Sequence, residues 1–209
     1  MNGRFYIGKD GELRDSENRV FNAWDWQWET PTMTASEAGQ IVDVTKALAT
    51  VLQGGNARRL PVGIIGPREA TARQESKAEQ IGRQLGQLGL TVMCGGRGGV
   101  MAAAARGARD AGGLTIGMLP EPDWRSANSD IVVPLATGLG EARNAVIARA
   151  SVALVAVGSS YGTLTEVAFG LHFGRPVIGT EGAPDLAGLE LLDSVEEIID
   201  RVSCILLTF

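Results

Sequence analysis

The fold is decided by one stretch, which reads Val152-Ala153-Leu154-Val155-Ala156-Val157-Gly158-Ser159-Ser160-Tyr161-Gly162-Thr163-Leu164-Thr165-Glu166. An apolar run that predicts a buried strand leads into a loop of glycine and hydroxyl residues, and a helical pattern follows the loop. A loop of small residues lets backbone N–H groups turn inward, and the helix behind it points its positive dipole end at the same place. The stretch therefore predicts a strand, a phosphate-binding loop and a helix, in that order.

Strands and helices alternate on both sides of this stretch, from Pro61 onward. Further apolar runs predict strands at 62–65, 91–94, 114–119, 131–133 and 176–179. Helical patterns separate most of them, and a short last helix opens at the capping box 194–197 and ends before Cys204. Such alternation is typical of a parallel sheet with helices on both faces. We expect an α/β fold with a doubly wound, mostly parallel, Rossmann-like sheet of about six to seven strands.

Residues 1–60 follow a different pattern. The segment from Phe5 to Leu13 predicts a hairpin that turns at Asp10-Gly11. A capping box at 34–37 predicts the start of a helix of about five turns, which passes through Ile41 and ends at Gly54. We therefore expect two parts: a hairpin-plus-helix extension over 1–60 and a Rossmann-like ligand-binding domain over 61–209.

Tryptophan occupies every second position at Trp24, Trp26 and Trp28. In a strand these three rings would share one face. The simpler interpretation is that this face packs on the domain or on another subunit. The alternative is a stacking wall for a flat heterocycle.

Composition and charge argue against several classes of protein. The net charge is −5 and the pI is about 5.0, with no basic cluster beyond Arg58-Arg59, so a nucleic-acid groove is not expected. No apolar run approaches the roughly 18 residues of a membrane helix, and the N-terminus lacks the apolar core of a signal peptide. Cys94 and Cys204 stand far apart, which is typical of a reduced, cytoplasmic protein.

Histidine and lysine are scarce, which limits the chemistry. The only histidine, His172, lies in a predicted helix, so neither a Ser-His-Asp relay nor a His-rich metal site is expected. The only lysines are Lys9, Lys46 and Lys77, and none is placed at a strand end or glycine loop to hold pyridoxal phosphate.

Three loops lie at the carboxyl ends of predicted strands, where doubly wound sheets bind ligands. They are Gly66-Pro67-Arg68, the glycine run 95–99 and the loop 158–163. The usual strand order 3-2-1-4-5-6 would bring the first and fifth strands near the switch point. The glycine run could also serve tight packing. It does not follow the dinucleotide-binding spacing G-x-G-x-x-G, and the acidic residue that follows, Glu121, lies in a polar loop rather than at a clear strand end, so NAD is not expected.

Two charged residues could serve a ligand at these loops. Arg143, next to Asn144 on a predicted helix, is a natural fork for phosphate, although a solvated or ion-paired face would also explain it. Glu166 lies in the first turn of the helix after the loop, where it could complement the dipole, bind a ribose hydroxyl or act as a general acid/base. Cys94 is expected to be a buried small residue rather than a reactive thiolate.

Three ordered motifs carry a resemblance to a known family. They are Cys94-Gly95-Gly96-Arg97-Gly98-Gly99-Val100-Met101, Gly138-Leu139-Gly140-Glu141-Ala142-Arg143-Asn144, and the loop 158–166. Together they resemble the molybdenum cofactor carrier proteins, within the wider group of the Lonely Guy enzymes. The resemblance covers about Pro61 to Gly179 and implies a Rossmann-like fold and a dimeric or tetrameric assembly.

The resemblance implies two alternative functions. The Lonely Guy enzymes hydrolyse the N-glycosidic bond of nucleoside 5′-monophosphates, and in that case Arg143 and Glu166 would be the working pair. The enzymes have Pro-Gly-Gly where this chain has Gly158-Ser159-Ser160, and lysine where it has Asn144. These departures favour a carrier that holds the molybdenum cofactor as cargo. A third alternative is an interaction module built on the tryptophans and the helix at 140–150.

We therefore expect a phosphorylated ligand and no partner nucleic acid or membrane. The expected ligand-binding residues are Gly66, Arg68, Gly96, Gly98, Gly99, Arg143, Asn144, Ser159, Ser160, Tyr161, Gly162, Thr163 and Glu166.

Overall fold

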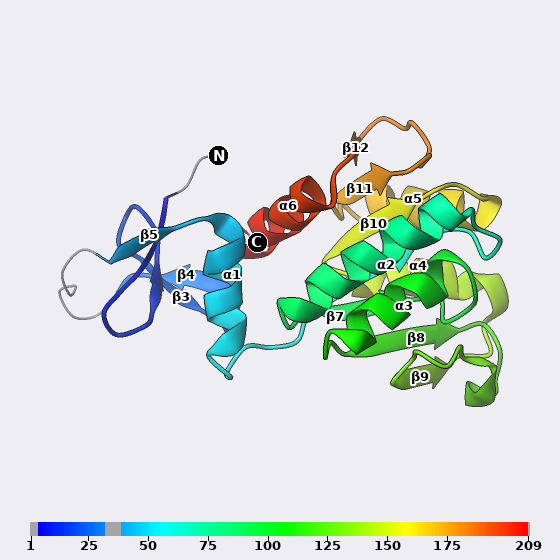
Figure 1. The fold of residues 1–209 in the computed structure, drawn as a ribbon, viewed down its shortest axis with the longest axis horizontal. Coiled ribbons are helices and arrows are strands. Elements are labelled where there is room, and N and C mark those ends of the chain that lie inside the picture. Colours follow the sequence, from blue (N-terminus) through cyan, green and yellow to red (C-terminus); the bar gives the residue numbers. More distant parts are fainter. Residues whose placement is uncertain (1–3, 32–38, 209) are drawn as a thin grey trace. The chain divides into compact units, whose positions relative to one another are not determined.

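The computed structural model describes residues 4–31 and 39–208. The chain forms two compact units, Leu60–Ile199 and a smaller one that joins Met1–Arg59 to Asp200–Phe209 (Figure 1). The predicted division at residue 60 places the last ten residues with the Rossmann-like domain, whereas in the structure they lie with the N-terminal segment. No helix in the described residues is long and apolar enough to cross a membrane.

The larger unit is built on a seven-stranded sheet that is parallel throughout, which confirms the predicted fold class. Its order is β12-β11-β10-β6-β7-β8-β9. The strands are β6 (Pro61–Ile65), β7 (Thr91–Cys94), β8 (Thr115–Leu119), β9 (Val133–Ala136), β10 (Ala153–Val157), β11 (Val177–Thr180) and β12 (Leu189–Leu191).

The strand order corrects the expected one at a single strand. The fourth core strand, β9, pairs with β8 at the edge of the sheet and does not lie beside the first strand, β6. The fifth core strand, β10, takes that place and pairs with β6 from Ala153–Val62 to Ala156–Ile65. The order therefore reverses between β6 and β10, and the loops that follow these two strands are neighbours.

Helices cover the sheet and supply its core. They are α2 (Ala72–Gln87), α3 (Val100–Asp110), α4 (Arg143–Ala150) and α5 (Tyr161–His172), with short 3₁₀ turns at Trp124–Ser126 and Gly140–Ala142. The last helix, α6 (Val195–Leu207), begins in this unit, and its residues from Asp200 on belong to the smaller one. Helix α2 begins at a capping box of Thr71 and Gln74. Helix α6 continues through Leu207, so the helix expected to end before Cys204 is longer than predicted.

Helices α2 and α3 lie side by side (Figure 1) because glycine brings their backbones together. A Cβ atom on Gly107 would meet the carbonyl oxygen of Glu79, and one on Gly82 would meet that of Ala104. Neither backbone atom can move aside as a flexible side chain could. The close crossing therefore depends on these two glycines.

A methyl group at this crossing is expected to destabilise the larger unit. Gly107→Ala should lower the free energy of unfolding by about 2 kcal/mol, because the helices must separate to admit it. Gly54→Ala is the control, since Gly54 ends a helix at φ −63° with its nearest neighbour 3.4 Å from the added Cβ. Chemical denaturation measures both; equal stability of Gly107→Ala and the unchanged protein would contradict the proposed packing.

The smaller unit is an antiparallel sheet in the order β4-β3-β2-β1-β5, with helix α1 (Val44–Gln53). Its strands are β1 (Phe5–Ile7), β2 (Leu13–Arg14), β3 (Val20–Asn22), β4 (Gln27–Glu29) and β5 (Gln40–Val42). The predicted hairpin is confirmed in β1 and β2. Helix α1 is shorter than expected: Asp43 caps it, and Ile41 lies in β5. The predicted capping box at 34–37 lies outside the described residues.

The three tryptophans do not share one strand face, so that prediction is wrong. Only Trp28 lies in a strand; Trp24 and Trp26 belong to the turn between β3 and β4, where Trp26 has a φ of +54°. The Trp26 ring is buried edge-on against Phe21, and the Trp24 ring is half exposed. The alternation of only three residues does not establish a strand, because this segment forms a tight turn in which the side chains point in different directions.

Candidate functional site

A cavity of about 170 Å³ lies at the carboxyl edge of the sheet, where the loops after β6 and β10 meet. It is lined by the two loops, the glycine run after β7 and the facing ends of α4 and α5. The lining residues are Gly66, Arg68, Arg97, Met101, Glu141, Arg143, Asn144, Ser160, Gly162, Thr163 and Glu166.

The structure brings most of the predicted ligand residues to this cavity, but not all of them. Those that do not line it are Gly96, Gly98, Gly99, Ser159 and Tyr161. Sequence reasoning missed Arg97, Met101 and Glu141, which do line it. The sequence could have predicted Arg97, because it is a cationic residue inside a glycine run at the carboxyl end of a predicted strand.

Arg143 is the most deeply placed cation of the site. It begins α4, its residue surface is only 5% exposed, and within the described chain its Nε and Nη1 atoms donate no hydrogen bond. A buried guanidinium without acceptors is costly unless something supplies them. The solvated alternative for Arg143 is therefore wrong, whereas the ion-paired alternative agrees with its 3.7 Å contact to Glu166.

Gly95 makes room for this guanidinium. A Cβ atom at Gly95 would meet Nη1 of Arg143 and would lie 2.6 Å from its Nη2 atom. The first glycine of the run thus has a specific role that the motif alone did not reveal. Any side chain here would push Arg143 out of its position.

Glu166 faces Arg143 from α5. Nη1 of Arg143 lies 3.7 Å from Oε1 of Glu166, which is within ion-pair range but too long for a hydrogen bond. Burial raises the pKa of Glu166 to about 8; the Arg143 charge opposes this rise, and the Glu141 charge adds to it. Burial prevails because no hydrogen bond from the described residues stabilises the carboxylate, so the protonated form of Glu166 is favoured at neutral pH.

The N-terminus of α5 opens into the same cavity. The hydroxyl of Ser160 caps the helix by accepting the N–H of Thr163 at 3.1 Å, and it lies 2.8 Å from the Thr163 hydroxyl. The first N–H groups of a helix lack intrahelical acceptors, so they provide donors for an anion at the positive end of the dipole. Tyr161 is 90% exposed and does not contribute its ring to the cavity wall.

Asn144 connects α4 to α5. Its amide donates to the Thr165 hydroxyl at 2.8 Å and to the Gly162 carbonyl at 3.5 Å. The side chain is buried and its donors are already engaged. Asn144 therefore fixes the first turn of α5 opposite Arg143.

The glycine run packs the loops more than it lines the cavity. A Cβ atom on Gly99, which has a φ of +61°, would meet the carbonyl oxygens of Pro67 and Arg68. A Cβ atom on Gly96 would meet Leu119 at 2.5 Å. Gly99 thus lies close to the loop after β6, and Gly96 lies close to the end of β8, while the predicted approach of these glycines to a ligand stays a prediction. Arg97, between them, pairs with Glu121 in the loop after β8.

Cys94 and His172 contribute no chemistry to the cavity. Cys94 is fully buried, and burial raises its pKa to about 11, so the thiol is protonated. His172 ends α5, where its ring lies 5.5 Å from that of Phe173. Within residues 4–31 and 39–208, no group of three or more His, Cys, Asp or Glu side chains could hold a metal ion.

The arrangement suits an anionic group. Three arginines, Arg68, Arg97 and Arg143, reach the cavity, against two glutamates of which one is protonated at neutral pH. A helix N-terminus adds oriented donors. Planar guanidinium groups and backbone N–H groups are the donors that proteins use for phosphate.

Comparison with known proteins gives consistent matches over the larger unit. A sequence profile of the SLOG cluster4 family matches residues 59–202. A protein of Archaeoglobus fulgidus is 34% identical over 142 residues, which is 68% of this chain and 93% of that protein. The molybdenum cofactor binding protein of Rippkaea orientalis is 33% identical, with a TM-score of 0.67, over 71% of this chain and 98% of that one. The molybdenum cofactor carrier protein of Chlamydomonas reinhardtii is 34% identical, with a TM-score of 0.67, over 73% and 100%.

Proposed function

Because the chain belongs to the SLOG cluster4 family, we propose that it binds and carries a phosphorylated small molecule, the molybdenum cofactor, in the cavity between β6 and β10. The resemblance to molybdenum cofactor carrier proteins that the sequence motifs predict is confirmed by the solved structures at 33–34% identity. The cofactor is cargo in this proposal and not a resident catalytic group.

One observation carries the proposal: two donor atoms of the buried Arg143 guanidinium, Nε and Nη1, make no hydrogen bond among the described residues beside the cavity. A phosphate oxygen would supply the acceptors that these residues do not. The first turn of α5 would donate to the same phosphate from its backbone, and Arg68 and Arg97 would neutralise further negative charge. A bound anion therefore resolves an unfavourable feature of the free protein.

Uptake of molybdopterin under anaerobic conditions tests the proposal. We expect saturable binding by the purified protein and at least tenfold weaker binding by Ser160→Asp, since a carboxylate would repel the phosphate. Aspartate caps a helix as well as serine does, so α5 should remain intact. Ser76→Asp, which adds the same charge on the exposed part of α2, is the control. Absence of uptake, or equal binding by Ser160→Asp, would refute this function.

A second function, nucleotide phosphoribohydrolase, is favoured by the state of Glu166. A buried glutamic acid that keeps its proton to about pH 8 can act as a general acid beside Arg143. In this case the protein releases free base from a nucleoside 5′-monophosphate such as AMP, and Glu166→Gln abolishes the release. Chromatography of the products decides; intact nucleotide across a broad panel excludes the hydrolase without affecting the carrier proposal.

A further inference from the structure

The N-terminal unit has a cavity of its own, and the family match begins only at residue 59. Its volume is about 490 Å³, larger than that of the cavity at the sheet edge. All of its lining residues lie between Gly11 and Asn56, so it is contained within one compact unit. Nothing in the proposed carrier function uses it.

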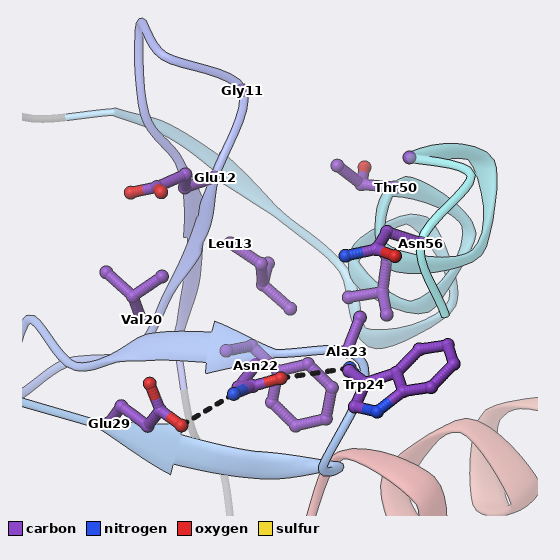
Figure 2. A pocket seen from close by; sticks show the side chains of 13 residues that line it. Gly11, Glu12, Leu13, Val20, Asn22, Ala23, Trp24, Glu29, Thr50 and Asn56 are labelled. Atoms are coloured by element: carbon purple, nitrogen blue, oxygen red, sulfur yellow. Dashed lines mark hydrogen bonds between the residues drawn. The ribbon is translucent and has the colours of Figure 1, made fainter. Parts of the chain in front are cut away.

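The walls combine an apolar base with polar groups, as ligand pockets of this volume do. Leu13, Phe21 and Val51 are buried side chains that line it. Figure 2 shows the polar residues that reach it from different elements: Glu12 from the first hairpin, Glu29 from β4 and Thr50 from α1. The unit thus holds a hollow with both apolar surface and hydrogen-bonding groups.

The lining holds one carboxylate, Glu29, that has no cationic partner among the described residues. Its other ionisable residue, Glu12, is already paired, because its Oε2 atom lies 2.8 Å from Nη2 of Arg14. None of the described lining residues is a lysine or an arginine. Oε1 of Glu29 accepts from the Asn22 amide at 2.6 Å (Figure 2). It also accepts from the Gln27 amide at 3.2 Å, and the two bonds hold the carboxylate in position. Among the described residues, no donor reaches its second oxygen, Oε2.

The end of helix α1 adds to this negative potential. Thr50, Val51 and Gly54 line the cavity at the C-terminus of α1, and the last turn of that helix contains no basic residue. The last carbonyl groups of a helix carry partial negative charge and stabilise a nearby cation. Two independent elements, a positioned carboxylate and a helix C-terminus, therefore favour the same sign of ligand.

Trp24 supplies an aromatic surface that already binds a cation. Its ring lines the cavity and is half exposed, unlike the buried Trp26 ring of the same turn. The Arg58 guanidinium lies 4.7 Å from the Trp24 ring centroid. Indole rings attract flat cations through their quadrupole, and this one has accessible area left over.

We propose that this cavity binds an organic cation, a planar amidinium or guanidinium group joined to an apolar body. The charged group lies against Glu29, and the apolar body packs on the base formed by Leu13 and Phe21 and on Trp24. The site is separate in sequence from the phosphate cavity and takes a ligand of opposite charge. It stands whether or not the larger unit carries the molybdenum cofactor.

Benzamidine, a planar amidinium on a phenyl ring, is the probe for the full-length protein. Isothermal titration should give a Kd of about 1 mM or below, in the range expected for so small a ligand. Neutral benzamide has the same shape, and its affinity should be lower than that of benzamidine by a factor of about ten or more. Raising NaCl from about 50 to 500 mM should weaken benzamidine binding, since an exposed charge is screened.

Two variants locate the site. Glu29→Gln keeps the shape and hydrogen bonds of the side chain and should weaken benzamidine binding about tenfold. Trp24→Leu removes the ring from an exposed position and should weaken it as well. Glu17→Gln, on an exposed side chain of the same unit outside the cavity, is the control for net charge. Equal affinity for benzamide and benzamidine, no measurable binding, or unchanged affinity in both Glu29→Gln and Trp24→Leu would overturn the proposal.

Discussion

Affinity for inorganic phosphate should fall about 100-fold when Arg143 is replaced by leucine, because the anion loses a pair of charge-assisted hydrogen bonds. The free energy of unfolding should not fall with it. Arg143 is buried, and its Nε and Nη1 atoms make no hydrogen bond to the described residues, so its removal relieves a desolvation cost. Loss of the Arg143 charge leaves no uncompensated carboxylate at Glu166, because burial already favours its protonated form at neutral pH.

This combination separates a binding role from a structural one. A residue that merely stabilises α4 would lose stability and binding together when truncated. Isothermal titration with phosphate and chemical denaturation at pH 7 measure the two quantities. Arg83→Leu is the matched control: it removes one positive charge from the exposed surface of α2, where Arg83 pairs with Glu79 at 3.1 Å. It should change phosphate affinity little.

Gly95→Ala reaches the same site without changing its charge. The added methyl group would occupy the space of the Arg143 guanidinium, which must then turn away from its present position. Phosphate affinity should fall, although by less than in Arg143→Leu, because the cation is still present. Wild-type affinity in both variants would mean that phosphate binds elsewhere.

The sequence was sufficient to predict the core of the larger unit, for a physical reason. Strands that are buried on both faces have continuous apolar runs, and the runs at β6, β7 and β10 are read without ambiguity. The position of β9 was not predictable in this way. An apolar run defines a strand but not its neighbour, and the partner of an edge strand is decided by the path of the connections.

The site was predicted in part. The motifs pointed to Arg143 and Glu166, and the structure places them 3.7 Å apart. What the sequence could not reveal is their protonation and pairing, because burial depends on residues distant in the chain, such as Gly95 beside Arg143. The glycine run was assigned to the ligand as a group, whereas Gly99 packs against the loop after β6 and only Arg97 of the run lines the cavity.

The stability of the protein should decrease between about pH 4.5 and pH 8 because of Glu166. Its pKa is about 8 in the folded protein against an ordinary value of 4.5. Below the lower value both states hold the proton. Between the two values the unfolded chain loses it and the folded chain keeps it, so unfolding becomes easier by up to about 1.4 kcal/mol per pH unit. Above pH 8 both states are ionised and the slope ends.

Glu166→Gln isolates this effect, because glutamine has a similar shape and does not titrate. Chemical denaturation at several pH values should show the unchanged protein losing stability relative to Glu166→Gln through this window. Sulfate binding provides a second measurement, because sulfate keeps its charge over this pH range. Above pH 8 the ionised Glu166 carboxylate pairs with Arg143 and repels the anion. Sulfate affinity should therefore fall in the unchanged protein and not in Glu166→Gln. Parallel pH profiles for the two proteins would show that Glu166 is ionised at neutral pH, and Arg143 would then be paired within the protein rather than open to a ligand.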